Sequence, residues 1–315
     1  MRTIAPLCLA LAAGLALAGE PQPFEFKPVS EDSLGLWEGQ DPVLVYNHGM
    51  ISRKGVPDRY DRACYIHPLY GLDGEVLTDD FPRDHRHHRG VFWAWPHIRA
   101  RGQEANSWIP SGIQDRHERW VRREVDGGRA VLEVQNGWYM GDQKVMDERV
   151  RITVHPAAED ARAIDLEFTW TPVGQAVTLR GAGGKSYGGL TVRFNTRPRE
   201  KDRIPTSKVT ITVPRGVTEK DLPDTRLKWA DFTAPFPGAP GPSGVAVFVA
   251  PDHPDYPPTW LTRHYGCLCV GWPGVKGKTL PPGEPVRCRY RLWVHRGQPS
   301  LDELRAAYQA YAETE

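Results

Sequence analysis

Cysteine, excess charge and long apolar stretches are all scarce in this sequence of 315 residues. Five cysteines are too few for a disulfide-held scaffold of this length. Forty basic residues balance 39 acidic ones, so the formal net charge is +1. This balance excludes binding driven by bulk charge, such as sequence-independent attachment to nucleic acid or anionic lipid. Beyond the first twenty residues, no apolar stretch approaches the length that spans a membrane.

Several catalytic motifs are also missing. The sequence contains no G-x-S-x-G element, no H-E-x-x-H element and no cysteine placed beside a recognisable base for nucleophilic attack. The glycine-rich segment 183–189 lacks the spacing of a phosphate-binding loop, and a strand pattern follows it where such a loop requires a helix. Nucleotide binding is therefore not expected.

The first residues have the pattern of a secretory signal peptide. Arg2 precedes an apolar stretch from Ile4 to Ala18, which ends in the small-residue sequence A-L-A. We expect cleavage after Ala18 and an exported protein, either periplasmic or extracellular. Cys8 lies inside the apolar stretch and does not follow the cleavage site, so a lipoprotein is not expected.

The remaining cysteines are Cys64, Cys267, Cys269 and Cys288. Export permits disulfides, but the C-x-C spacing at 267 and 269 matches no common zinc motif. Free cysteine is among the residue types most often buried, so buried free thiols are favoured. A bridge from Cys267 or Cys269 to Cys288 is the alternative.

Alternation of apolar and polar residues dominates the chain. It is clear at 150–154, 164–170 and 286–294, and it is typical of antiparallel strands with one buried face. Residues 244–250 are apolar on both faces and predict a strand inside a stack of sheets. The frequency of glycine (31) and proline (29) agrees with many short strands joined by turns.

Only one helix is predicted, at the C-terminal end. Ser300 and Glu303 have the spacing of a capping box, which predicts a helix beginning at Leu301. The predicted fold class is therefore all-β: one large antiparallel β-sandwich over residues 19–315, closed by a short C-terminal helix.

Titratable side chains are most concentrated in a segment bracketed by proline and glycine, which we expect to be a loop before a strand at Val91–Trp95. It contains Asp84, His85, His87 and His88. Three interpretations remain open for it.

In the first, His85 and His87 bind a divalent metal, because side chains two apart on an extended chain point the same way. Asp84 or a distant histidine would complete the site. In the second, one histidine and a nearby carboxylate perform general acid–base catalysis, since imidazole titrates near neutral pH. In the third, these groups only hydrogen-bond one another in a polar loop. The sequence requires no cofactor and leaves a divalent metal open.

Two other segments suit a polar ligand. Asn47 and His48 end an apolar strand pattern, where rigid sheets often carry binding residues; an ordinary turn is the alternative. Arg263, His264 and Tyr265 precede another strand pattern, where a proline-rich surface loop is the alternative.

Arg193 is a further candidate. It alternates with Val192 and Phe194 and so faces away from them. On a concave sheet face, Arg193 would bind an anion or a hydroxyl group.

A set of motifs extends over most of the chain: Tyr65-x-His67-Pro68, Gly71-x-Asp73-Gly74, Asp84-His85-x-His87-His88-Arg89-Gly90-x-Phe92-Trp93-Ala94-Trp95, Lys185-x-Tyr187-Gly188-Gly189-Leu190-x-x-Arg193-Phe194, Asp252-His253-Pro254, Thr259-Trp260, Tyr265-Gly266 and Trp293-x-x-His295-Arg296-Gly297. Together they resemble an exported bacterial family labelled "methane oxygenase PmoA". The label implies little, because the methane monooxygenase subunit of that name is an integral membrane protein. The resemblance implies no catalytic residue. It implies export in polysaccharide-degrading bacteria and a β-sandwich like that of galactose mutarotase-type proteins.

We interpret the sequence as an exported carbohydrate-active protein, and as an enzyme that cleaves a sugar bond by hydrolysis or elimination. The expected acid–base group is His87 or His88, with Asp84 as its orienting carboxylate. Sugar hydroxyls need polar partners, and sugar C–H faces stack on aromatic rings. The candidate substrate-binding residues are Asn47, His48, His67, Arg89, Trp93, Trp95, Arg193, Arg263, His264 and Tyr265.

The two adjacent histidines should differ in role. On an extended chain they point to opposite sides, which assigns catalysis to His87 and a stabilising role to His88, whereas a turned loop would let them exchange roles. A non-catalytic sugar-binding module and a metal-dependent enzyme are the other classes that stay open.

Overall fold

The computed structural model describes residues 23–197 and 202–314, and within them every pairing between strands is antiparallel. The all-β prediction is confirmed. The expected signal peptide, residues 1–18, lies outside the described residues. No helix within the described residues is both long and apolar enough to cross a membrane.

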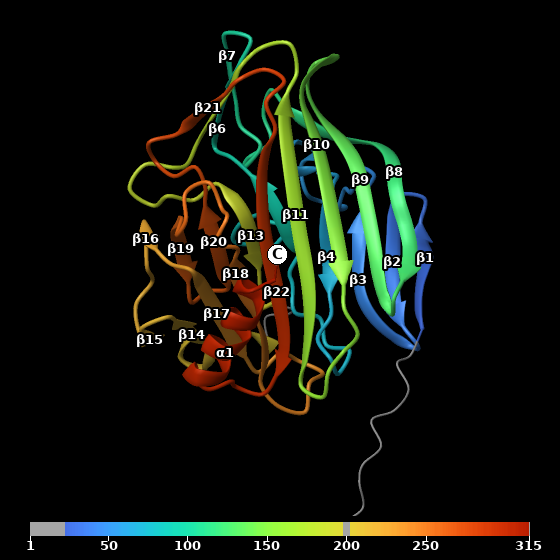
Figure 1. The fold of residues 1–315 in the computed structure, drawn as a ribbon, viewed down its shortest axis with the longest axis vertical. Helices are drawn as coiled ribbons and strands as arrows, with labels where there is room; N and C mark the ends of the chain where they lie inside the picture. Colours follow the sequence, from blue (N-terminus) through green and yellow to red (C-terminus); the bar gives the residue numbers. More distant parts are fainter. Residues whose placement is uncertain (1–22, 198–201, 315) are drawn as a thin grey trace, which may run out of the picture.

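Two nine-stranded sheets stack on one another (Figure 1). The first sheet has the order β1 (Phe24–Ser30), β2 (Ser33–Glu38), β3 (Asp41–Asn47), β4 (Tyr65–Leu69), β5 (Val91–Ala94), β13 (Gly189–Arg193), β20 (Cys267–Gly271), β19 (Thr259–Arg263), β16 (Thr225–Arg226). The second sheet has the order β15 (Gly216–Thr218), β14 (Thr210–Val213), β17 (Trp229–Ala234), β18 (Ser243–Val249), β22 (Val286–Arg296), β11 (Ala161–Pro172), β10 (Gln143–Val154), β9 (Arg129–Met140), β8 (Gln114–Asp126).

Four predicted strands lie in the second sheet, and the one predicted at Val91–Trp95 is β5 of the first sheet. The three alternating segments fall in β10, β11 and β22, where apolar residues are buried and their neighbours are more exposed. The segment that is apolar on both faces is β18, which is buried along its whole length. The period-two pattern was sufficient to predict β10, β11 and β22 because each of these strands has one face on the core.

The core lies between the two sheets. Ring contacts cross it from β5 to β11 (Trp93 to Phe168, 4.7 Å between centroids) and from the first sheet to β17 (Phe194 to Phe232, 4.0 Å). A second, smaller apolar cluster covers the other face of the first sheet and includes Tyr65 and Phe92. We call this the outer face of the first sheet.

The remaining elements are small. A four-stranded sheet has the order β21 (Lys278–Leu280), β12 (Val177–Arg180), β6 (His97–Ala100), β7 (Gln103–Ala105). Single-turn 3₁₀ helices span Asp58–Tyr60 and Thr206–Lys208.

The predicted C-terminal helix is α1 (Leu301–Ala312), and its capping box is present. The Ser300 hydroxyl accepts from the Glu303 N–H (3.2 Å), and the Glu303 carboxylate accepts from the Ser300 N–H (2.7 Å). Leu304, Tyr308 and Tyr311 pack against the second sheet on the side away from the core.

All four cysteines of the described residues are buried and free. The prediction of buried free thiols is confirmed, and no bridge joins Cys267 or Cys269 to Cys288.

Candidate functional site

The His-rich segment is a turned loop on the outer face of the first sheet, and it leads into β5 as expected. The His85 N–H donates to the Pro82 carbonyl (3.1 Å), and the His88 N–H donates to the His85 carbonyl (2.8 Å). These bonds from residue i+3 to residue i make two consecutive turns. The rings of His85 and His88 therefore stack at 4.7 Å, whereas those of His85 and His87 lie nearly perpendicular at 5.7 Å.

Asp84 holds three cationic or titratable groups together. Its Oδ1 accepts from Arg193 Nη2 (2.8 Å) and its Oδ2 from Arg197 Nη1 (3.0 Å), while His85 Nδ1 lies 3.3 Å from Oδ2. Burial alone would raise the pKa of Asp84, but the contact with His85 and the charge of Arg193 hold it below its ordinary value. Asp84 is thus an ionised carboxylate beside His85, and not beside His87 or His88 as the sequence analysis expected.

Arg193 lies beneath the loop. It is fully buried on β13 and faces away from the core residues Val192 and Phe194, as the alternation predicted. Its guanidinium lies over the ring of Tyr265 (4.8 Å), and that ring stacks on His85 (5.2 Å, 11°). Arg193, Tyr265 and His85 therefore form one continuous stack.

Aromatic rings extend this stack on the side of His87. The His87 ring lies 4.7 Å from that of His88 and 6.3 Å from that of Trp108. Trp108 in turn lies 4.7 Å from Tyr187, and Tyr60 lies 6.5 Å from His87. Sequence reasoning missed Trp108, which stands in no distinctive motif, whereas Tyr187 belongs to a motif that carried the family resemblance.

Burial and nearby positive charge lower the pKa of two imidazoles in the loop. Burial, and then the charges of His85, Arg62, Arg89 and Arg193, lower the pKa of His87 to about 3. Burial and its cationic neighbours also lower the pKa of His88, which is 2% exposed. Both rings are therefore neutral at pH 7.

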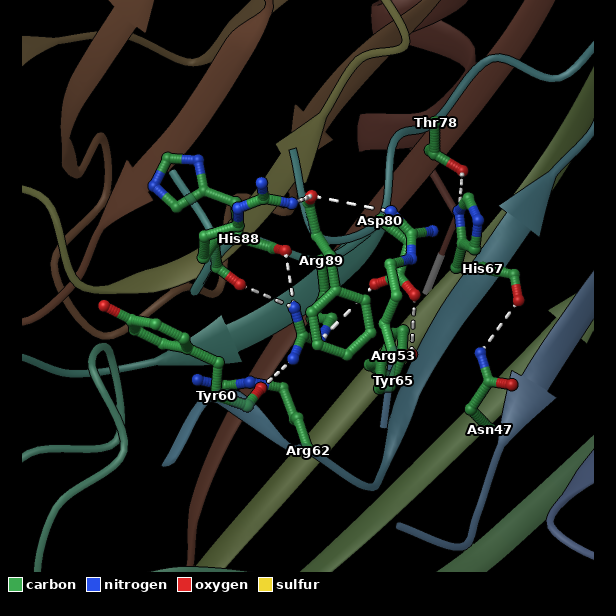
Figure 2. Close-up of polar contacts among 12 residues, drawn as sticks. Asn47, Arg53, Tyr60, Arg62, Tyr65, His67, Thr78, Asp80, His88 and Arg89 are labelled. Atoms are coloured by element: carbon green, nitrogen blue, oxygen red, sulfur yellow. Dashed lines mark hydrogen bonds and ion pairs between the residues drawn. The ribbon is translucent and has the colours of Figure 1, made fainter. Parts of the chain in front are cut away.

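The guanidinium of Arg89 forms its contacts with other groups of the protein. Figure 2 shows its guanidinium among backbone carbonyls: it donates to those of Arg86 (3.0 Å), His88 (3.0 Å) and Tyr60. Asp80 lies 3.4 Å from its Nε, and the guanidinium covers the ring of Phe81 at 3.4 Å. Arg89 therefore fixes the shape of the loop, which differs from the predicted role of a substrate ligand.

Asn47 and His67 also have partners inside the protein (Figure 2). Asn47 Nδ2 donates to the His67 carbonyl (2.8 Å), and Asn47 Oδ1 accepts from Ser33 (2.8 Å). His67 Nδ1 lies 3.1 Å from Thr78 Oγ1, and burial lowers the pKa of His67 to about 3. These contacts tie β3 to β4 and leave neither side chain directed at a ligand.

Three predicted residues lie away from the loop. His48 packs against His117 (5.4 Å) and Trp120 (5.0 Å) beside β8. Arg263 and His264 both bind Asp221, at 3.0 and 2.8 Å. Of the three residues predicted together before β20, only Tyr265 joins the candidate site.

Trp93 and Trp95 differ from their predicted role of stacking on a ligand. Both are buried, at 4% and 0% exposure. The Trp93 indole donates to Glu148 (2.8 Å) and the Trp95 indole donates to the Trp272 carbonyl (2.6 Å). Period-two alternation along β5 and the residue after it places both on the side that points to the second sheet, so they belong to the core.

The described residues contain no group of three or more His, Cys, Asp or Glu side chains that converges as a metal site would. The expected pair His85 and His87 does not share a direction, because the loop is turned. The arrangement offers a carboxylate–imidazole pair, neutral imidazoles and a buried guanidinium.

Solved structures similar to this chain come from sugar-processing proteins. A polysaccharide lyase is 14% identical (TM-score 0.36) over 91% of this chain and 34% of its own. A protein assigned as an aldose 1-epimerase, from Escherichia coli K12, is 10% identical (TM-score 0.36) over 87% of this chain and 99% of its own. A protein assigned as a kojibiose phosphorylase, from the human microbiome, is 7% identical (TM-score 0.40) over 90% of this chain and 32% of its own.

The chain thus spans about a third of the lyase and of the phosphorylase. These similarities are too low to assign an activity, and no curated protein matches the sequence. A family model does match, over residues 36–309, and its description is "Family of unknown function". The chain therefore belongs to this family of unknown function, DUF6807.

Proposed function

We propose that the protein is an exported enzyme that acts on an anionic sugar, such as a uronate, at the outer face of the first sheet. Export rests on the signal-peptide pattern of residues 1–18. The ligand class rests on one observation: the guanidinium of Arg193 is buried beneath the loop with its Nε and Nη1 free of hydrogen bonds within the described residues, and Arg62 and Arg89 add positive charge near the half-buried His87. Such a field favours a carboxylate in the ligand and disfavours an additional cation.

Arg197 supports the same ligand class. Asp84 pairs with both Arg193 and Arg197, so two guanidinium groups share this one carboxylate. The Arg197 side chain is 33% exposed and can reach a ligand, whereas Arg193 is buried beneath the loop. The rings of His87, Tyr187 and Tyr265 are half-buried and offer surfaces for sugar C–H groups.

His85 is the acid–base group that the geometry favours. Its Nδ1 faces Asp84, so a carboxylate can fix the tautomer and leave Nε2 to exchange a proton with the substrate. The side chain is 35% exposed. His88, in contrast, is buried, and the described neighbours of His87 are the rings of Tyr60, His85, His88 and Trp108.

These groups suit an elimination reaction better than a hydrolysis reaction that is catalysed by two carboxyl groups. Hydrolysis of that kind needs a protonated carboxyl as general acid, and Asp84 is held ionised. In elimination, His85 Nε2 would take the proton at C5, next to the uronate carboxylate. The C4–C5 double bond would form as the C4–O bond breaks, and the leaving oxygen would take a proton from the Tyr265 hydroxyl. Burial raises the pKa of Tyr265, which keeps its proton available at pH 7.

The test is turnover of polygalacturonate and alginate, followed by the ultraviolet absorbance of the unsaturated product, with a neutral glucan as a comparison substrate. We expect His85→Ala to lower the rate by about 10²–10⁴-fold. His97→Ala, a half-buried histidine on β6, is the matched control and should retain the rate.

A wild-type rate in His85→Ala, or turnover of the neutral glucan alone, would refute the proposal. Binding of an oligouronate without turnover, unchanged by His85→Ala, would favour the non-catalytic sugar-binding module.

A further inference from the structure

A polar groove lies on the face of the second sheet that points away from the core. Its volume is about 350 Å³, and β9, β10, β11, β22 and the end of α1 line it. Figure 1 shows β11 and β22 as long neighbouring strands. Helix α1 lies on the face of the second sheet that carries the groove. Five arginines line the groove: Arg129, Arg151, Arg287, Arg289 and Arg291.

Strand register brings these charges into rows. Glu167 of β11 lies between Arg151 of β10 and Arg289 of β22. Residues two apart on a strand face the same side at a spacing of roughly 6.6 Å. The three arginines of β22 therefore form a regularly spaced line along the groove.

Carboxylates neutralise only some of these arginines. Arg287 pairs with Glu167, Arg291 pairs with Asp165 (2.6 Å), and Arg289 pairs with Asp252 (2.9 Å).

The other two arginines, Arg129 and Arg151, have no carboxylate partner in the part of the chain that the structure describes. Arg151 Nε is also buried without a hydrogen bond. The groove thus holds an excess of two positive charges on a chain whose overall net charge is +1.

We propose that this groove binds an anionic polysaccharide, carboxylated or sulfated, with its acidic groups at Arg129 and Arg151, beside the arginine line of β22. The planar guanidinium donates two parallel hydrogen bonds to a carboxylate or sulfate. Hydroxyl groups of Thr153, Thr314 and Tyr311 line the same groove and can meet sugar hydroxyls. The Tyr311 hydroxyl is buried without a partner.

This surface is independent of the proposed catalytic site. The His-rich loop covers the outer face of the first sheet, and the groove lies on the opposite side of the sandwich. Binding in the groove would hold a polymer on the protein without using His85 or Asp84.

The test measures equilibrium binding of the full protein to polygalacturonate, to heparin and to neutral dextran. The groove variant is Arg129→Gln with Arg151→Gln, and the control variant is Arg99→Gln with Arg180→Gln, which removes the same charge from exposed positions on the small sheet. Melting temperatures of both variants verify folding.

We expect saturable binding of one or both polyanions that weakens with added salt. The groove variant should bind about tenfold more weakly, and the control variant should bind like the parent protein. Preference for polygalacturonate would identify carboxylates as the ligand groups, and preference for heparin would identify sulfates.

Three outcomes would overturn the proposal: no binding of either polyanion, equal weakening in the groove and control variants, or equally tight binding of dextran or double-stranded DNA. Loss of uronate turnover in His85→Ala with intact polyanion binding would leave the groove assignment standing.

Discussion

The indole N–H of Trp93 donates a hydrogen bond to Glu148 Oε2 across the space between the two large sheets, at 2.8 Å. Trp138 and Trp170 donate to the same oxygen, at 3.0 and 2.8 Å, and Asn136 Nδ2 donates to Oε1 at 3.0 Å. The carboxylate is fully buried. Burial raises the pKa of Glu148, and the four hydrogen bonds oppose that rise. One carboxylate therefore organises three of the eleven tryptophans.

Glu148→Gln should destabilise the protein, because an amide offers one acceptor oxygen where the carboxylate offers two. Either the three indoles or Asn136 would then face an N–H₂ group. We expect the free energy of unfolding to fall by about 1–3 kcal/mol, measured by urea denaturation. Glu124→Gln, at an exposed position on β8, is the control. Equal stability of both variants would mean that the indole hydrogen bonds contribute nothing net.

Stability should decrease as the pH falls below about 6.5, partly through His67. Burial and the charges of Arg53 and Arg89 lower the pKa of His67 from 6.5 to about 3 in the folded protein. Between these values the unfolded chain binds a proton that the folded chain does not, so acid favours unfolding. Melting temperatures measured from pH 7 to pH 4.5 should therefore fall with pH, and less steeply in His67→Gln. An identical slope in the variant would contradict this assignment.

His87 and His88 should respond differently to replacement by alanine. His88 is buried, stacks on His85 (4.7 Å) and meets Trp108 edge-on (5.3 Å), so His88→Ala should lower the free energy of unfolding by about 2–4 kcal/mol. His87 is half-buried, and His87→Ala should leave the melting temperature unchanged while raising KM for a uronate substrate by about tenfold. If both variants had the melting temperature and kinetics of the parent protein, the loop would be only a polar surface turn.

Processing after Ala18 should be visible in the thiol count. Cleavage removes Cys8 and leaves four cysteines, all of them buried in the folded protein. Protein secreted from a bacterial host should therefore show no reactive thiol when native and four in denaturant. Mass spectrometry should place its N-terminus at Gly19. Five thiols and an intact Met1 on soluble protein would contradict export.

The sequence by itself determined the fold class, several central strands, the helix and the position of the His-rich loop. Alternation in β10, β11 and β22 reports which side chains face the core, and a capping box is a local signal that needs no other part of the chain. The sequence also identified Arg193, because a strand pattern gives the face on which a residue lies, and Tyr265, because it stands among ligand-type residues before a strand.

Only the tertiary structure decided which side chains meet. The two turns at residues 82–88 pair Asp84 with His85 and bury His88, whereas an extended chain would have grouped His85 with His87. Trp93 belongs to the core because its partner Glu148 lies on the other sheet, 55 residues away. Such contacts depend on how two sheets stack and on how a loop folds over one of them, and neither is encoded in the periodicity of a single segment.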